Sequence, residues 1–468
     1  MTTTPAHENS ASRDSIQDRI TQYAGDLDYA HIPADVRHAA KTRLIDTLGV
    51  LIGGYDGAPC RIARDLAAQM PNAAGATIIG TALKTTPDMA AFVNATTARY
   101  AELTDTYHWP GSAYGHPSDI VMPVLAAAEV AKAGGRELIT AIVLAYEIFC
   151  RLSDGFHNKG FDPLNFACIA TAAAAARLFG LTAEQRAHAI AMAAVPNIML
   201  KQVRVDHLTM FKVAASGQAG RSGVFAAMLA RAGMEGPHLP FEGRAGWCEN
   251  IARERFSLET MGDADTPYKI LATRFKTRPC AGNTISSVLA AEKITSLKNP
   301  GDVERISVEV YKRAKIASGS DAHFWNPDSP GTADHSIPYL VAVALLEGTI
   351  TPRSFDSEHL RNTAVRGLMA RLEVIENEDY TRAYEQLPQA HYTRVTVFMQ
   401  DGTQCVGQSG GGADDLAADK TDAQIAGKFS SLVKPALGED GVARALDQLW
   451  RLEDMQNVAH IVPLFTFA

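Results

Sequence analysis

The stretch from Asn165 to Phe179, NFACIATAAAAARLF, decides the expected fold, because small and apolar residues occupy it on every side. From Ala170 to Ala176 it contains no charged residue. A helix that is apolar all round is typical of the buried centre of a bundle rather than of a surface. Gly180 follows as a helix stop, and Thr182 with Gln185 has the pattern of a capping box for the next helix.

Helical periodicity covers most of the first half of the chain. Between residues 30 and 51, Val36, Ala40, Leu44 and Leu48 recur at the spacing of one helix face. The same pattern covers residues 87–99, 123–133, 138–149, 183–194 and 214–232. We therefore expect a large all-α helical domain.

The pattern changes near residue 269. Residues 306–311 and 392–398 alternate apolar and polar side chains as strands do, and Asp401-Gly402 after the second is a hairpin-turn signal. Helical patterns lie between them at 337–346 and return at 422–451. The predicted fold is mainly α. We expect a polar tail at 1–14, a large helical domain at 15–268, an inserted smaller α+β lid domain at 269–405, and C-terminal helices at 406–468 that return to the helical domain.

The composition is that of a globular protein. Among 468 residues, 46% are hydrophobic and 21% are charged, so the chain can bury a sizeable core. The formal net charge of −8 provides no global basic field, so we expect neither nucleic acid nor a membrane as a partner. We find no long apolar run and no apolar leader, and the six cysteines lack a metal-ligand spacing. These features predict a cytoplasmic protein without a metal site.

Five polar segments interrupt the apolar pattern and hold the candidate functional residues. In the first, residues 102–119, two histidines and three carboxylates lie between apolar helices. Gly115 and Pro117 flank His116 and restrict its backbone, so we expect this imidazole to be held on a rigid turn. The other segments are residues 155–163, 201–213, 274–284 and 325–339.

These segments also have plainer interpretations. Asp162 can act as a helix cap, the basic residues of 274–278 can be solvated at a domain boundary, and Asp334-His335 can simply begin a helix. Lys212 lies near the start of its helix, where the positive end of the dipole is unfavourable for a cation. Either a bound anion or a carboxylate partner, such as Asp206 or a distant residue, would compensate it.

The chain contains no glycine-rich nucleotide loop, HExxH or GxSxG motif. Nucleotide binding, zinc-protease chemistry and serine-hydrolase chemistry are therefore disfavoured. Histidine, lysine and carboxylate side chains instead favour an acid–base site for a small anionic substrate, with no evident cofactor.

Taken together, these segments resemble the MmgE/PrpD family, which includes 2-methylcitrate dehydratase, cis-aconitate decarboxylase and iminodisuccinate epimerase. The strongest matches are RLIDTLG at 43–49, GHPSD at 115–119, MFK at 210–212 and TADHS at 332–336, and the resemblance runs from about residue 15 to the C-terminus. It implies a large helical domain, a smaller α+β lid domain, a homodimer, and an active site between the domains without a metal or iron–sulfur cofactor.

The resemblance also implies site residues. Thr106, His116 and Lys212 match positions of the family's site. Glu102 stands where the decarboxylase pattern has aspartate, and Asp162 stands where it has a second histidine. Dehydratase-type members can carry aspartate at this second position, which argues against the decarboxylase.

A hydro-lyase that removes water from a small hydroxy-tricarboxylate, such as 2-methylcitrate, is the function that the resemblance predicts. His116 is the expected general acid or base, because imidazole titrates near neutral pH. Asp162 is the expected partner in the opposite proton transfer, Thr106 would orient the substrate, and Lys212 would stabilise developing negative charge. The further substrate-binding residues that we expect are Glu102, Asp105, Arg204, Lys276, Arg278, Asn283 and His335.

Three alternatives stay open. The same site could decarboxylate cis-aconitate, or it could epimerise a dicarboxylate such as iminodisuccinate, which also begins with removal of an α-proton. The protein could instead be a non-catalytic relative that binds a metabolite or forms a structural dimer. Departures from the family pattern at Glu102, Asp162 and Asn283, where a family histidine is replaced, keep this last reading open.

Overall fold

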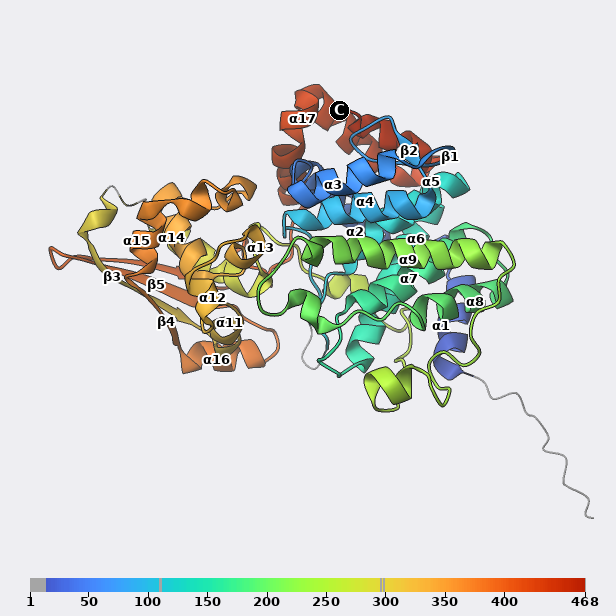
Figure 1. The fold of residues 1–468 in the computed structure, drawn as a ribbon, viewed down its shortest axis with the longest axis horizontal. Helices are drawn as coiled ribbons and strands as arrows, with labels where there is room; N and C mark the ends of the chain where they lie inside the picture. The colour runs from blue at the N-terminus through green and yellow to red at the C-terminus, as the bar shows by residue number, and fades with distance from the viewer. Residues whose placement is uncertain (1–13, 109–111, 295–296, 298, 468) are drawn as a thin grey trace, which may run out of the picture.

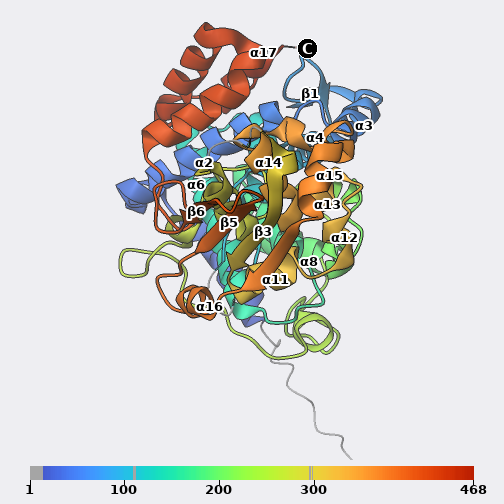
Figure 2. The same ribbon diagram turned by 90° about the vertical axis from the view of Figure 1, so that its left-hand side faces the viewer.

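The computed structural model describes residues 14–108, 112–294, 297 and 299–467. Buried apolar side chains form two large clusters. The first draws on residues between 16 and 275 and between 425 and 465, and we call residues 14–275 and 422–467 the helical lobe. The second draws on residues between 280 and 416, and we call residues 279–416 the sheet lobe. The two lobes lie side by side (Figure 1), and Figure 2 views the molecule from the sheet lobe.

The helical lobe is centred on the apolar stretch quoted above. This stretch forms α7, in which every residue from Leu164 to Ala176 is buried, so its predicted central position is confirmed. The predicted capping box of Thr182 and Gln185 is also present, at the start of α8. The helices of this part are α1 Ser15–Asp26, α2 Ala34–Gly53, α3 Ala58–Ala68, α4 Pro87–Tyr100, α5 Val121–Ala131, α6 Gly135–Gly155, α7 Leu164–Leu178, α8 Ala183–Ala194 and α9 Phe211–Arg231.

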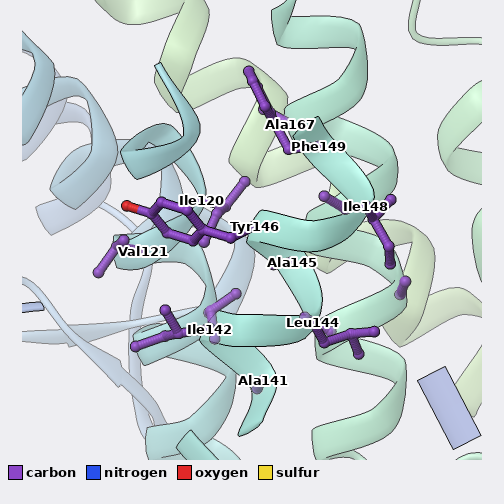
Figure 3. Packing of buried hydrophobic residues seen from close by; sticks show 14 of the residues in the cluster. Ile120, Val121, Ala141, Ile142, Leu144, Ala145, Tyr146, Ile148, Phe149 and Ala167 are labelled. Atoms are coloured by element: carbon purple, nitrogen blue, oxygen red, sulfur yellow. The ribbon is translucent and has the colours of Figure 1, made fainter. Parts of the chain in front are cut away.

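Helix α6 fixes the loop that precedes α5. Figure 3 shows apolar side chains projecting from several sides of α6, with Tyr146 lying near Ile120 and Val121. The short 3-10 helix Pro117–Ile120, which leads into α5, packs against both α6 and α7. The turn at residues 115–117 is therefore anchored to the most buried part of the lobe.

One feature of the helical lobe differs from the expected all-α domain. Strands β1 Pro71–Thr77 and β2 Lys84–Thr85 pair antiparallel in a small two-stranded sheet. The small residues of β1 lack the alternation that predicts a strand. Only glycine fits at Gly75, because a Cβ there would lie 1.8 Å from the carbonyl oxygen of Thr85.

The sheet lobe contains a four-stranded sheet in the order β4-β3-β5-β6. β3 pairs parallel with β4 and antiparallel with β5, and β5 and β6 form the predicted hairpin, in which Gly402 has a φ of 87°. Strand β4 was not expected from the sequence. The strands are β3 Val303–Val310, β4 Leu372–Glu376, β5 Thr393–Met399 and β6 Gln404–Ser409.

Helices cover this sheet. α10 packs against β5, β6 and α14, and α11 and α14 both contact β4. The helices are α10 Ile285–Glu292, α11 Lys312–Ser318, α12 Ala322–Trp325, α13 Pro330–Ala333, α14 Ile337–Glu347, α15 Thr363–Met369 and α16 Glu378–Glu385.

The C-terminal part of the chain packs on the helical lobe. The predicted helix at 422–451 is observed as α17, Asp422–Trp450, which is interrupted at Gly438 and lies against α2. In Figure 1 it lies above α2 and α3, away from the sheet lobe. Phe429 of α17 packs directly on Gly49 of α2, where a Cβ would lie 3.0 Å from its ring.

The predicted polar tail at 1–14 falls outside the described residues except for Asp14. The carboxylate of Asp14 caps α1 by accepting a hydrogen bond from the amide of Gln17, at 3.0 Å. Among the helices of the described residues, none combines the length and apolarity that crossing a membrane would require.

Candidate functional site

The carboxylate of Glu102 is the centre of a buried cluster of cations. Lys276 Nζ lies 2.6 Å from its Oε1, and Lys212 Nζ lies 3.0 Å from its Oε2. Arg99 donates to both oxygens, at 2.7 and 3.1 Å. All four side chains are at most 3% exposed. Three cations from separate parts of the chain thus meet on one carboxylate, and we call these four residues the Glu102 cluster.

The backbone brings these groups together at some cost. Glu102 follows the end of α4 with a φ of 50°, in the left-handed region, which costs about 1–3 kcal/mol for a residue with a side chain. Lys212 belongs to the first turn of α9. Lys276 lies in the segment between the lobes, and its carbonyl accepts a hydrogen bond from Lys428 of α17.

His116 faces this cluster with one ring nitrogen. Its Nδ1 lies 2.8 Å from the carbonyl oxygen of Asp105, which can only accept, so Nδ1 carries the proton. Its Nε2 lies 3.7 Å from Oε1 of Glu102. Burial, together with the charges of Arg99 and Lys276, holds the pKa of His116 well below its usual value. The imidazole is therefore neutral, with a free electron pair on Nε2.

The turn that carries His116 is tightly packed. A Cβ at Gly115 would lie 2.8 Å from the ring of Phe149 and 2.9 Å from Pro163, so only glycine fits there. Asp105 anchors the same turn. Its Oδ1 accepts from the amide of Ser118 and its Oδ2 from the hydroxyl of Tyr146.

Asp105 was expected to bind substrate, but it is 1% exposed and both of its carboxylate oxygens have protein donors. The structure therefore gives Asp105 a positioning role: it holds the turn and orients His116 through its backbone carbonyl.

Charges in and around the Glu102 cluster are balanced. Asp119 lies 3.6 Å from Nε of Arg99, and Asp334 lies 3.4 Å from Nζ of Lys212. Burial alone raises the pKa of Glu102, but the surrounding cations lower it well below its usual value. Burial lowers the pKa of Lys276, although the charge of Glu102 opposes this.

Lys212 pairs with carboxylates that are distant in the sequence, which is one of the two ways of compensating its charge that the sequence suggested. These partners are Glu102 and Asp334. Asp206, which was the local alternative, instead accepts a hydrogen bond from Gln202 at 2.9 Å. His335 bonds to Asp334 through Nδ1, and this nitrogen lies 3.4 Å from Nζ of Lys212, so His335 borders the cluster.

Asp162 and Arg204 form a separate pair. Arg204 Nε donates to Oδ2 of Asp162 at 2.7 Å, while Oδ1 of Asp162 accepts from the amide of Leu164 at the start of α7. Lys201 Nζ lies 3.9 Å from the same carboxylate. Asp162 is thus a helix cap and an ion-pair partner, and it makes no direct contact with the Glu102 cluster within the described structure.

Two other predicted residues lie away from the cluster. Arg278 makes two hydrogen bonds to the carboxylate of Glu292, at 2.6 and 2.7 Å. Asn283 donates to the hydroxyl of Ser318 at 2.9 Å.

A cavity of about 480 Å³ lies between the two lobes, and we call it the interlobe cavity. The ring of Tyr114 lies edge-on to the ring of His116, with centroids 5.5 Å apart, and separates the cavity from the imidazole. Thr106, whose hydroxyl donates to the carbonyl of Gly115, is also part of its wall. Its lining includes Thr106, Tyr114, Arg274, Asn283, Arg313 and His391.

The sequence interpretation missed several of these groups. Arg99 and Asp119 complete the charge network, and Tyr114, Arg274 and Arg313 line the cavity. The spacing of Arg99 and Glu102, three residues apart, is the one local signal that indicates their pairing. In the part of the chain that the structure describes, no group of three or more His, Cys, Asp or Glu side chains is arranged to hold a metal ion.

Comparison with known proteins places the chain in a family. The model of the MmgE/PrpD N-terminal domain matches residues 18–259, and that of the MmgE/PrpD C-terminal domain matches residues 279–453. A 2-methylcitrate dehydratase of Salmonella typhi is 25% identical over 77% of this chain and 78% of its own length. A 2-methylcitrate dehydratase-like protein of Aspergillus oryzae is 27% identical over 86% of both chains. Human cis-aconitate decarboxylase is 24% identical over 94% of this chain and 92% of its own. Because the two domain models together cover most of its length, the chain belongs to the MmgE/PrpD family.

Proposed function

We propose that the protein is a hydro-lyase that eliminates water from a small hydroxy-tricarboxylate, such as 2-methylcitrate, by acid–base catalysis with its own side chains. The observation that carries this proposal is the convergence of His116, Lys212 and Lys276 around one buried carboxylate. Relatives named as dehydratases and as decarboxylases support a lyase of small polycarboxylic acids.

His116 is the proposed general base. Its lowered pKa keeps Nε2 unprotonated at neutral pH, as removal of a proton from carbon requires. The proton beside a carboxylate is only weakly acidic, so the negative charge that develops must meet fixed positive groups in a dry site. Lys212 and Lys276 provide such groups, because both are buried and held in place.

Lys276 is the proposed general acid. As the C–H bond breaks, its electron pair forms the C=C bond, the C–O bond breaks, and the leaving hydroxide takes a proton to become water. Burial lowers the pKa of Lys276 and so makes its ammonium a better proton donor. Asp162, the donor expected from the family pattern, is instead paired with Arg204.

Substrate entry requires the lobes to separate. Glu102 already pairs with the three cations, so an incoming carboxylate must share them with Glu102. His116 is only 6% exposed, so the substrate cannot reach it from solvent in the closed arrangement. The sheet lobe, proposed here as the lid, is held closed by the Lys212–Asp334 contact and by the stacked rings of His108 and Tyr384, 5.9 Å apart. Closure over the substrate would exclude water.

Incubation of the purified protein with citrate, 2-methylcitrate, cis-aconitate and iminodisuccinate in D₂O, followed by NMR, tests the reaction class. We expect loss of water from a hydroxy-tricarboxylate. Release of CO₂ from cis-aconitate would indicate a decarboxylase, and deuterium incorporation without loss of water would indicate an epimerase. Binding of these acids with no turnover of any of them would indicate the non-catalytic alternative.

A matched pair of variants tests the role of His116. His116→Gln should reduce kcat by on the order of 10²-fold or more while the circular dichroism spectrum is unchanged. His157→Gln is the control, since His157 is exposed and pairs only with Glu254 at the surface of the described structure. Normal turnover in folded His116→Gln protein would end the assignment.

We also propose that the protein acts as a homodimer, as the family resemblance implies. Size-exclusion chromatography with light scattering should then give about twice the chain mass of 50.2 kDa. A mass of one chain at working concentration would contradict this.

A further inference from the structure

We propose that the interlobe cavity is a carboxylate-recognition subsite, in which Arg313 of the sheet lobe selects a tricarboxylic acid over a dicarboxylic one. The proposal rests on the proposed function and deepens it, because it assigns the substrate class to a residue outside the Glu102 cluster. Arg313 is the second residue of α11 and lines the cavity from the side of the sheet lobe.

The cavity walls carry positive charge that is only partly compensated. Among the described residues that line it, two are arginines and none is Asp or Glu. Arg274 has a partner at 2.8 Å, but this partner, Asp419, is 92% exposed, so the pair is weak. His391 faces Asp415 at 3.6 Å. Arg313 has no ion-pair partner within the described residues, and its charge remains available to a ligand.

A further basic group outside the cavity lining, Lys201, is close enough to Arg313 for the charge of Arg313 to affect its pKa. Lys201 belongs to the helical lobe, where it shares the carboxylate of Asp162 with Arg204. Its pKa is lowered first by burial, and the charges of Arg204 and Arg313 add to this. Lys201 and Arg204 of the helical lobe therefore share one carboxylate, and the charge of Arg313 acts on Lys201 from the sheet lobe. An anionic ligand is the group that would relieve their repulsion.

Neutral polar groups complete the subsite. Burial lowers the pKa of His108 to about 4, so this imidazole is uncharged. Its Nδ1 lies 3.3 Å from Oε1 of Gln389 and 3.5 Å from the hydroxyl of Tyr384. Such groups can accept and donate hydrogen bonds without adding charge, and they leave Arg274 and Arg313 as the arginines of the cavity lining, of which Arg313 belongs to the sheet lobe.

The position of the cavity explains why it would discriminate by the number of carboxylates. Tyr114 lines the cavity, and its ring lies edge-on against the ring of His116. Two carboxylates of a substrate can engage Lys212 and Lys276 in the Glu102 cluster. A tricarboxylate has a third carboxylate to place in the cavity beside Arg313, whereas a dicarboxylate has none.

Isothermal titration calorimetry with non-reacting acids tests this. The probes are propane-1,2,3-tricarboxylate and glutarate, which has the same carbon chain without the central carboxylate. Arg313→Ala should weaken binding of the tricarboxylate on the order of 10-fold or more and change glutarate binding by less than about two-fold. Arg313→Lys should be intermediate. Lys312→Ala, which removes the same charge from the neighbouring position of α11 outside the cavity, should change neither.

The inference would be overturned if Arg313→Ala weakened the binding of both acids equally, or weakened the binding of neither. It would also be overturned if the wild-type protein failed to bind the tricarboxylate. These outcomes are separable from those for catalysis. A protein that turns over none of the four acids but shows the selective loss in Arg313→Ala keeps the subsite and loses the proposed function. A protein that dehydrates a tricarboxylate with unchanged KM and unchanged preference in Arg313→Ala keeps the function and loses the subsite.

Discussion

Replacement of Glu102 by glutamine removes the one negative charge on which three buried cations converge. Glutamine has nearly the same shape, so packing is preserved. Its amide oxygen can still accept from one of Lys212 and Lys276, but its NH₂ group must face a cation as a donor against a donor. Arg99, Lys212 and Lys276 then keep only Asp119 and Asp334 as nearby counter-charges, at 3.6 and 3.4 Å.

The expected cost follows from this geometry. Removing one partner from a buried ion pair destabilises a protein by about 3–5 kcal/mol, because the remaining charge is left uncompensated. Since the free energy of unfolding of a folded protein is about 5–15 kcal/mol, this is a large fraction of the total. For a chain of 468 residues the melting temperature should fall by roughly 3–5 °C.

Thermal unfolding followed by circular dichroism measures this change, with Glu129→Gln as the matched control. Glu129 is equally buried, but it has two hydrogen bonds from Thr77 and only one cation, Lys84, which is 40% exposed. Its substitution should cost less, about 1–2 kcal/mol.

A second substitution tests the cause of the loss. Lys276→Met, made in the Glu102→Gln background, removes one of the uncompensated charges and should recover part of the lost stability. A Glu102→Gln protein as stable as the wild type, or a double variant that is less stable still, would refute the assignment of Glu102 as the centre of a charge cluster.

Three further predictions concern catalysis and local packing. The rate constant kcat/KM should rise with pH through a pKa below 6.5, because the pKa of His116 is lowered and its base form is already present in weak acid. It should fall again at high pH, as the pH passes through the lowered pKa of Lys276. A rise of kcat/KM that is centred above pH 6.5 would contradict the assignment of His116. Lys212→Met should lower kcat by on the order of 10²-fold with an unchanged circular dichroism spectrum, whereas wild-type turnover would remove this lysine from the reaction. Gly75→Ala should lower the melting temperature by several degrees, because its Cβ would lie 1.8 Å from a carbonyl oxygen of the facing strand, while Gly301→Ala, with no atom within 4 Å, should leave it unchanged.

The helices were the most predictable part of the fold, because their signals are local. Residues 183–194 were predicted and observed as α8, between the Thr182 cap and the last alanine of the pattern. Strand β4 escaped prediction because five residues carry little periodicity, and its partner β3 lies more than 60 residues earlier in the chain. The pairing of β1 and β2 likewise depends on a close approach at Gly75 that no sequence pattern reveals.

The candidate site was predictable as a set of residues but not as a set of contacts. Lys276 and Arg278 are both basic and two residues apart, yet Lys276 points to Glu102 while Arg278 binds Glu292. Only the fold brings these carboxylates to their partners. Arg99 looked ordinary in the sequence, because a cation in the last turn of a helix already has a favourable interaction with the dipole.

A purely structural role for the Glu102 cluster is the main alternative to catalysis, and two local features argue against it. Among the described residues, Nε2 of His116 has no hydrogen-bond partner, although its other nitrogen is fixed by the carbonyl of Asp105. A histidine that served only to fill the core would be expected to satisfy both nitrogens. The second feature is the backbone of Glu102, which has a left-handed conformation with a φ of 50° and lies next to His116 in the site. The free nitrogen of a base and the strained backbone of the carboxylate that gathers three cations thus occur together near a cavity, and such costs are characteristically found at ligand sites.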